Sequence, residues 1–234
     1  MSAPMRLVLV RHGETVGHSS IRYYGRTDVA LSDLGRRQMR AAREWLAARD
    51  GASGFAPVFT SPLVRATEAA RIIAGRDAAA IAIEEFAEVD FGLFEGLTAE
   101  EIAARYPEEF RRWNVNRLAP DFVYPEGESR AAFVARVARG TARMLASWQA
   151  LWEALWHDAR ASGRAGPNAL IVAHRGVIRA VVRQLTGVFE PHIDLGSIHI
   201  LEQEPGGADL RTVRWRPVAL DLTEHLAGRG NTAE

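Results

Sequence analysis

The chain has 234 residues, of which 47% are hydrophobic and 25% charged, and its 29 basic side chains balance 29 acidic ones. These fractions are ordinary for a globular protein. A zero net charge argues against a broad nucleic-acid surface and against attraction to anionic membranes. No apolar run approaches the length of a membrane span, and the first residues do not resemble a secretory signal. We therefore expect a single cytoplasmic domain over residues 1–234, with no nucleic-acid or membrane partner.

The residue inventory removes several kinds of chemistry. There is no cysteine, which excludes disulfides, thiolate nucleophiles and cysteine-ligated metal centres. All 29 basic residues are arginine, so a Walker A lysine and a Schiff-base lysine are excluded as well. Any anion must therefore be recognised by arginine forks, histidines, backbone N–H groups or helix N-termini.

Apolar runs that predict buried strands alternate with amphipathic segments that predict helices. Ser32 is placed to cap the first helix, and Ser61 followed by Pro62 is placed to open the second. This alternation predicts an α/β fold, a three-layer α/β/α sandwich around a mostly parallel sheet. The strands are expected at 7–10, 57–60, 80–83 and 169–173, the helices at 32–49, 62–73, 99–106, 107–113, 129–161 and 177–185, and a closing hairpin at 197–201 and 210–215.

The segment at about 88–127 differs from this alternation. Thr98 and Glu101 form a capping-box pattern that opens a short helix, and two prolines make 115–127 a predicted loop. We expect this segment to be a helical insertion that covers one edge of the sheet. The tail at about 226–234 is expected to be loose.

Chemically capable residues follow three of the predicted strands. Arg11 and His12 follow the first strand, His174 follows the strand at 169–173, and Arg65 lies in the first turn of a helix that begins at a strand end. Ligands of open α/β sheets bind beyond the carboxyl ends of the strands, where such residues converge. The combination predicts a phosphate pocket with two arginines, two histidines and no metal requirement. The alternative is a structural histidine in each turn and a solvated surface arginine.

A phosphate pocket of this kind needs a proton donor. The acidic stretch that follows the strand at 80–83 offers several carboxyl groups beside aromatic residues, where burial would suit a general acid at neutral pH. The residue pattern alone does not choose among Glu85, Glu88, Asp90 and Glu95.

Six blocks of sequence carry a family resemblance: RHGET, YGRTDVALSDLG, SPLVRATEAA, EVDFGLFEG, PEGES and VAHRGVIR. In this order, over roughly residues 5–185, they resemble the histidine phosphatase superfamily, also called the phosphoglycerate mutase-like family. The resemblance implies a phosphoglycerate mutase-like fold with the insertion over the active site, and no cofactor. It implies that His12 is phosphorylated, that Arg11, Arg65 and His174 bind the phosphoryl oxygens, and that Glu88 is the acid.

The sequence departs from the family pattern at two positions. The family often has asparagine six residues after the nucleophile, where His18 stands, and a small residue after the second histidine, where Arg175 stands. His18 could donate the same hydrogen bond, and Arg175 could reach a second anionic group or point to solvent. Thr15 could reach phosphate or cap its own loop. The expected substrate-binding residues are Thr15, His18, Tyr24, Gly25, Arg26 and Arg175.

Mutases and phosphatases of this family share the phosphohistidine. Mutases usually carry Glu-Arg-His-Tyr-Gly at the acid, a lysine after it and a longer insertion, whereas this chain has Glu88-Val-Asp-Phe-Gly and no lysine. We therefore predict a metal-independent phosphomonoesterase that acts on small phosphorylated metabolites. The pair Arg111-Arg112 keeps a cofactor-dependent phosphoglycerate mutase as the alternative, and a phosphoprotein phosphatase or a phospho-ligand binding protein is a further one. Residues 106–129 resemble fructose-2,6-bisphosphatase, broad-specificity and α-ribazole phosphatases of the family.

Two other patterns have simpler interpretations. Trp148, Trp152 and Trp156 recur at four-residue spacing, which favours core packing over a self-association face, although a homodimer stays open. His192, Asp194 and His199 are metal-ligand types, but their spacing matches no strong motif, so no metal site is expected.

Overall fold

The structure, a computed structural model, describes residues 5–50, 54–75, 77–161, 168–204 and 209–227. Within these ranges the chain forms one mixed sheet, six α-helices and three short 3-10 helices. The strands are β1 (Arg6–Arg11), β2 (Val58–Thr60), β3 (Ala80–Ala82), β4 (Ala169–Ala173), β5 (Ile198–Gln203) and β6 (Trp215–Leu222). The helices are α1 (Asp33–Asp50), α2 (Val64–Ala74), α3 (Ala99–Arg105), α4 (Pro107–Asn116), α5 (Arg130–Ala161) and α6 (Arg175–Thr186), with η1 (Glu84–Phe86), η2 (Gly92–Phe94) and η3 (Glu224–Leu226).

The strand order is β3-β2-β4-β1-β5-β6. The first four strands of this order run parallel, and β5 is antiparallel to both β1 and β6. The β1–β4 register pairs Arg11 with Ala173. The residues that follow these two strands therefore leave the sheet side by side. The mostly parallel sheet predicted from the sequence is confirmed.

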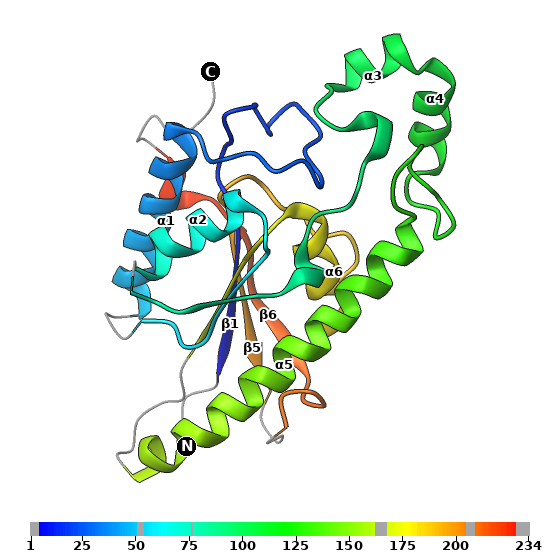
Figure 1. Ribbon diagram of the computed structural model, residues 1–234. Helices are drawn as coiled ribbons and strands as arrows, with labels where there is room; N and C mark the ends of the chain where they lie inside the picture. The colour runs from blue at the N-terminus through cyan, green and yellow to red at the C-terminus, as the bar shows by residue number, and fades with distance from the viewer. Residues whose placement is uncertain (1–4, 51–53, 76, 162–167, 205–208, 228–234) are drawn as a thin grey trace.

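Successive residues of the central strands face two separate cores, because strand side chains alternate between the faces of a sheet. In β1, Leu7 and Leu9 pack with residues of α5 and α6, and Val8 and Val10 pack with residues of α1 and α2. All four are fully buried. Figure 1 shows the resulting layers, with α1 and α2 on one side of the sheet and α5 and α6 on the other. The predicted α/β/α sandwich is confirmed.

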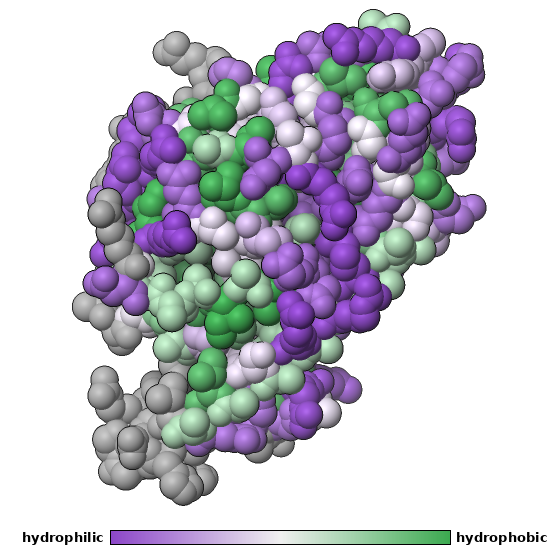
Figure 2. Space-filling view, viewed as in Figure 1, coloured by the Kyte–Doolittle hydropathy of each residue, from purple (hydrophilic) through white to green (hydrophobic). Residues whose placement is uncertain are grey.

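The long helix α5 closes one core with an apolar face that includes Phe133, Val137 and Met144. Trp148 is fully buried, and its ring lies 5.6 Å from that of Trp215 between centroids. Trp152 is partly buried against the same core, as core packing predicts, and the side chain of Trp156 lies outside the described residues. In Figure 2, the visible surface over the upper and middle part of α5 is mainly hydrophilic. The homodimer stays a prediction.

Several predicted boundaries are wrong, among them the ends of β5 at Gln203 rather than 201 and of β6 at Leu222 rather than 215. The helix α2 begins at Val64 rather than residue 62, because the Ser61 hydroxyl accepts a hydrogen bond from the Leu63 N–H within a tight turn before the helix. The strand β6 begins at Trp215 rather than residue 210, because residues 209–213 form a turn around the carbonyl of Asp209. The helix α6 begins at Arg175 rather than residue 177, and α4 continues to 116 rather than 113.

The insertion contains η2, α3 and α4, which lie beyond one end of the sheet in Figure 1. The predicted capping box of Thr98 and Glu101 is present. Glu101 also forms an ion pair with Arg22, which ties the insertion to the loop after β1. Residues 228–234 of the predicted loose tail lie outside the described residues. In the described part of the chain, no helix combines the length and the apolar character needed to cross a membrane.

Candidate active site

The carboxyl ends of three parallel strands meet at one place. The His12 N–H donates to the Ala173 carbonyl at 3.1 Å, and the Ser61 N–H donates to the Val172 carbonyl at 3.1 Å. This register brings the two histidines that the sequence singled out against each other. The ring centroids of His12 and His174 lie 5.1 Å apart, with an angle of 65° between the ring planes. Both side chains are buried.

One hydrogen bond fixes the orientation of the His12 ring. Its Nδ1 lies 2.7 Å from the Gly13 carbonyl oxygen, which can only accept, so Nδ1 carries the proton. The other nitrogen, Nε2, therefore holds a lone pair. Burial, with the charges of Arg65 and Arg11, keeps the pKa of His12 well below its usual value. The ring is therefore uncharged at neutral pH.

The His174 ring is held from the opposite side. Its Nε2 lies 2.7 Å from the hydroxyl of Ser61, which is fully buried. That hydroxyl also accepts the Leu63 N–H at 3.3 Å, and it can donate its own proton to His174 Nε2. With the hydroxyl as donor, the ring proton is on Nδ1, a buried atom without a partner among the described residues. Burial and the charge of Arg65 also keep the pKa of His174 well below its usual value.

Arg11 is buried at the end of β1, where its Nη1 donates to the Ile193 carbonyl at 3.1 Å. Its Nε is buried and has no partner in the described part of the structure. Burial, and next the charge of Arg175, lower the pKa of Arg11 to about 9, so it is still a cation at neutral pH. A guanidinium has five N–H donors, so most of the donors of Arg11 are open to a ligand.

Arg65 is fully buried in the first turn of α2. Its Nη1 donates to the Thr27 carbonyl at 2.8 Å, and its Nη2 donates to the carbonyls of Gly25 at 2.6 Å and Tyr24 at 3.2 Å. Its Nε, like that of Arg11, is buried without a partner among the described residues. Three bonds to one loop leave Arg65 rigidly placed, with donors still available to an anion.

The contacts of the candidate acids separate Glu88 from the others. Glu88 is buried, and its carboxylate accepts N–H groups of Val89 at 3.0 Å and Gly176 at 2.9 Å, so it lies against the first turn of α6, beside His174. The others are engaged elsewhere. Glu85 pairs with Arg143, Asp90 accepts the Gly92 N–H, and Glu95 accepts N–H groups of residues 25–27.

The expected substrate-binding residues fall into two groups. Tyr24 and Gly25 act through carbonyls that hold Arg65, and the Thr15 hydroxyl accepts the Ser19 N–H, so these three shape the loop. His18, Arg26 and Arg175 are exposed. His18 has a φ of 61°, a left-handed conformation within a turn of the loop. Substrate contact stays a prediction for all six.

Sequence reasoning missed two supports of the site. Ser61 was expected to be a helix cap, but it bridges to His174, 113 residues away. Glu95 was considered as an acid, but its carboxylate fixes the loop that holds Arg65. The pattern around Ser61 describes only local structure, so nothing in the sequence itself pointed to the bond. The acidic character of Glu95 was visible, but its partners were not.

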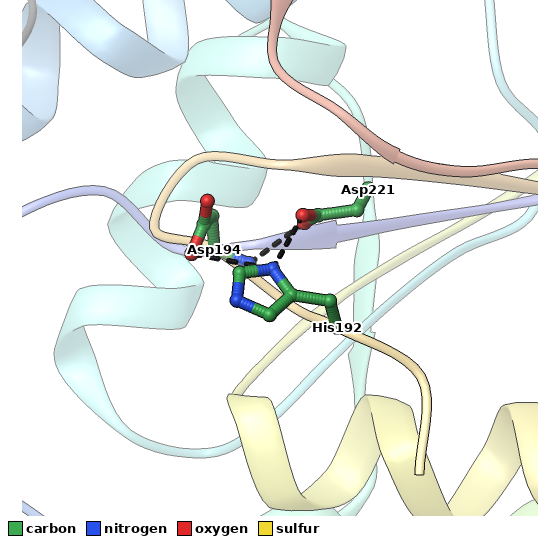
Figure 3. Close-up of side chains that lie close together, drawn as sticks. All are labelled: His192, Asp194 and Asp221. Atoms are coloured by element: carbon green, nitrogen blue, oxygen red, sulfur yellow. Dashed lines mark hydrogen bonds and ion pairs between the residues drawn. The ribbon is translucent and has the colours of Figure 1, made fainter. Parts of the chain in front are cut away.

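A further group of ionisable side chains lies near Arg11 (Figure 3). His192 Nδ1 is 2.7 Å from an Asp221 carboxylate oxygen and 3.6 Å from one of Asp194. His199 is not part of this group, because it is buried with Nε2 against the Ser197 hydroxyl and Nδ1 accepting the Asp221 N–H. The His192–Asp221 hydrogen bond, and the Asp194 N–H that donates to Asp221, connect the loop that precedes β5 to the end of β6. His192 and Asp194 flank Ile193, whose backbone carbonyl accepts the hydrogen bond from Arg11.

Arg11 and Arg65 act on a neutral His12 at the carboxyl ends of a mostly parallel sheet, and both keep a buried N–H without a partner among the described residues, an arrangement that is able to bind an anion. Residues 7–216 match the model of the histidine phosphatase superfamily (branch 1). The chain belongs to this superfamily.

Known relatives agree with that assignment. A bifunctional protein of Mycobacterium tuberculosis is 35% identical over 212 residues, which cover 88% of this chain and 52% of the relative. The chain thus spans about half the length of the mycobacterial relatives it matches. The uncharacterized phosphatase PhoE of Bacillus subtilis is 28% identical, with 94% of this chain and 96% of the relative covered. The solved structure of mycobacterial glucosyl-3-phosphoglycerate phosphatase has a TM-score of 0.71 at 28% identity, with coverage of 94% and 99%.

Proposed function

We propose that the chain is a metal-independent phosphatase that hydrolyses small phosphomonoesters through a phosphohistidine at His12. The observation that carries the proposal is the state of His12, a neutral imidazole whose Nδ1 is fixed on the Gly13 carbonyl and whose Nε2 is free. Its neighbours Arg11, Arg65 and His174 each keep a buried donor without a partner in the described structure. Similarity to a glucosyl-3-phosphoglycerate phosphatase supports a small phosphorylated metabolite as substrate.

The first half of the reaction forms the phosphoenzyme. His12 Nε2 attacks phosphorus while the bond from phosphorus to the leaving oxygen breaks, and Glu88 gives its proton to that oxygen. The dianionic substrate favours the protonated form of Glu88, because like charges repel. Arg11, Arg65 and the Nδ1–H of His174 stabilise the equatorial oxygens as they gain negative charge.

The second half returns the enzyme to its starting state. The Glu88 carboxylate takes a proton from water, the water oxygen bonds to phosphorus, and the P–N bond breaks. His12 then leaves as a neutral imidazole, and its Nδ1–H still donates to the Gly13 carbonyl. Inorganic phosphate and Glu88 with its proton are the products, so the cycle needs no metal or organic cofactor.

The insertion does not favour the mutase alternative. A mutase must retain a second phosphorylated molecule, which calls for extra cations over the pocket. Of the arginine pair that suggested this role, Arg111 forms an exposed ion pair with Glu108 on its own helix. Phosphatase activity is therefore the function that the arrangement supports best.

The test is phosphate release from a panel of phosphomonoesters in the presence of EDTA. The panel contains sugar phosphates, phosphoglycerates, a bisphosphate and an aryl phosphate. We expect release that survives the chelator and is abolished by His12→Ala. Release that EDTA abolishes, or that His12→Ala retains, would contradict the proposal. Phosphoryl transfer between phosphoglycerates without release would favour the mutase.

A further inference from the structure

Arg175 lies at the edge of the candidate active site. It is the first residue of α6 and directly follows His174, and the N–H of the next residue, Gly176, donates to Glu88. The side chain of Arg175 is exposed. In the described ranges it forms no hydrogen bond and no ion pair with another residue. A cation thus stands beside two catalytic candidates without an anion to balance it.

The neighbouring arginines on this side of the molecule are balanced. Arg130 and Arg179 both contact the Glu190 carboxylate, at 2.8 Å and 3.6 Å. Arg179 also donates from Nε to the Pro191 carbonyl at 3.0 Å. Local acids and carbonyls therefore satisfy these two side chains. Arg175 differs from them because it directly follows His174 and has no such partner within the described structure.

The charge of Arg175 affects the pKa values of two other side chains. After burial, it is the largest cause that lowers the pKa of Arg11. Burial raises the pKa of Tyr23, and the charge of Arg175 opposes that increase. The Tyr23 ring is fixed edge-on to Phe91 and Trp113, with centroid distances of 5.5 Å and 5.6 Å. The charge of Arg175 is therefore felt both by Arg11 and by a tyrosine whose ring is packed against two aromatic neighbours.

The carboxylates whose charges act on Arg11 are those of Glu88, Asp194 and Glu14, and within the described residues none of them forms an ion pair with Arg175. We infer that Arg175 binds a second anionic group of the substrate. The preferred substrates are then phosphomonoesters that also carry a carboxylate or a second phosphate. This inference rests on the proposed function, because it concerns the same pocket.

Arginine suits this task. Its planar fork matches both carboxylate and phosphate oxygens, and a charge-assisted contact is stronger than a neutral hydrogen bond. The position of Arg175 also fits, because the part of the substrate beyond the leaving oxygen must extend from the buried His12 toward solvent, and Arg175 is exposed. An arginine that merely extends into solvent would not discriminate between phosphomonoesters with and without a second anionic group.

The experiment compares substrates that differ in one anionic group. 3-Phosphoglycerate and glycerol 3-phosphate differ by a carboxylate in place of a hydroxymethyl group. Fructose 1,6-bisphosphate and fructose 6-phosphate differ by a second phosphate. The value of kcat/KM is measured for each with the wild type, Arg175→Gln and Arg183→Gln. Arg183 is the matched control, because it is exposed near the other end of the same helix.

We expect the wild type to prefer the more anionic member of at least one pair, and the preferred pair tells whether carboxylate or phosphate is recognised. Arg175→Gln should lower kcat/KM for that member by about tenfold or more, the scale of a charge-assisted contact. Arg175→Gln should change kcat/KM for the less anionic member little, and Arg183→Gln should leave kcat/KM for both members unchanged. Equal effects of Arg175→Gln on both members, or no effect on either, would overturn the inference.

A binding measurement separates this inference from the proposed function. If the wild type releases phosphate from none of the four compounds, the proposed function fails, but calorimetry on the His12→Ala protein still tests Arg175. The inference then requires tighter binding of the more anionic member and loss of that difference in the His12→Ala, Arg175→Gln double variant. Equal binding of both members by the His12→Ala protein would overturn it.

Discussion

The imidazole rings of His12 and His174 lie 5.1 Å apart, yet each is fixed by a different partner. The backbone carbonyl of Gly13 holds the first ring, and the hydroxyl of Ser61 holds the second. The first ring thereby exposes a lone pair, and the second exposes an N–H. Two identical side chains in one pocket can thus take opposite roles, one as nucleophile and the other as donor to an oxyanion.

Glu88→Gln tests the role of the acid. We expect turnover of alkyl phosphates, whose leaving oxygen needs a proton, to fall about 100-fold or more, the scale of general acid catalysis. The pre-steady-state burst of nitrophenol from a nitrophenyl phosphate, which reports formation of the phosphoenzyme alone and whose leaving group needs no proton, should fall far less. The aryl substrate also reports that the variant is folded. Equal losses for both substrates would contradict the role of Glu88 as acid.

Ser61→Ala tests the bond that orients His174. Loss of this hydroxyl frees the ring to turn and to exchange its protonated nitrogen, so we expect kcat to fall about fivefold, in line with one buried hydrogen bond of about 1 kcal/mol. Thr60→Val is the matched control, because it removes an adjacent buried hydroxyl that donates to a backbone carbonyl. A similar loss of kcat in both variants would assign the effect to strand stability rather than to His174.

Gly35→Ala tests the packing of α1 on the loop after β1. A Cβ at Gly35 would lie 2.0 Å from the Glu14 carbonyl oxygen, so the backbone must shift. We expect a loss of about 1–3 kcal/mol in the free energy of unfolding, as for an overpacked site. Helix propensity alone predicts the opposite sign, a gain of about 1 kcal/mol. Urea unfolding decides between the two, and a more stable variant would contradict the close contact.

The pH dependence of stability tests the burial of His199. Burial lowers the pKa of His199 to about 4, against 6.5 for an exposed histidine. The unfolded chain therefore binds the proton first as the pH falls, and stability decreases between these two values. The loss attributable to His199 is about 2 kcal/mol at pH 5 relative to pH 7.5. His199→Gln should lose less by about that amount in urea unfolding, and equal losses in both proteins would contradict the assignment.

Much of the fold could be predicted because its signals are local. The apolar runs of β1 and β4 indicate strands buried on both faces, and Thr98 with Glu101 indicates a helix start. The positions of His12 and His174 just after those strands suggested that the two histidines would meet. The start of β6 was not predictable in this way, because the turn at Asp209 depends on hydrogen bonds that the apolar pattern does not show.

The contacts that hold the site residues in place could not be predicted from local sequence patterns. Glu88 was chosen among the nearby acids by family resemblance, and the physical distinction is its contact with the Gly176 N–H, 88 residues away. The bonds from Ser61 to His174 and from Glu95 to residues 25–27 likewise join distant segments. Such pairings follow from strand order and loop path. Sequence spacing alone does not specify them.

The central claim is that His12 carries the phosphoryl group, and trapping that group tests it most directly. The protein is mixed with an aryl phosphate, quenched with alkali within milliseconds, digested and analysed by mass spectrometry under conditions that preserve phosphohistidine. The account predicts one phosphoryl group on the peptide that contains His12, with none in His12→Ala and an increased amount when hydrolysis is slowed by Glu88→Gln. A wild-type enzyme that turns over rapidly while the label is absent, or lies on another residue, would contradict it.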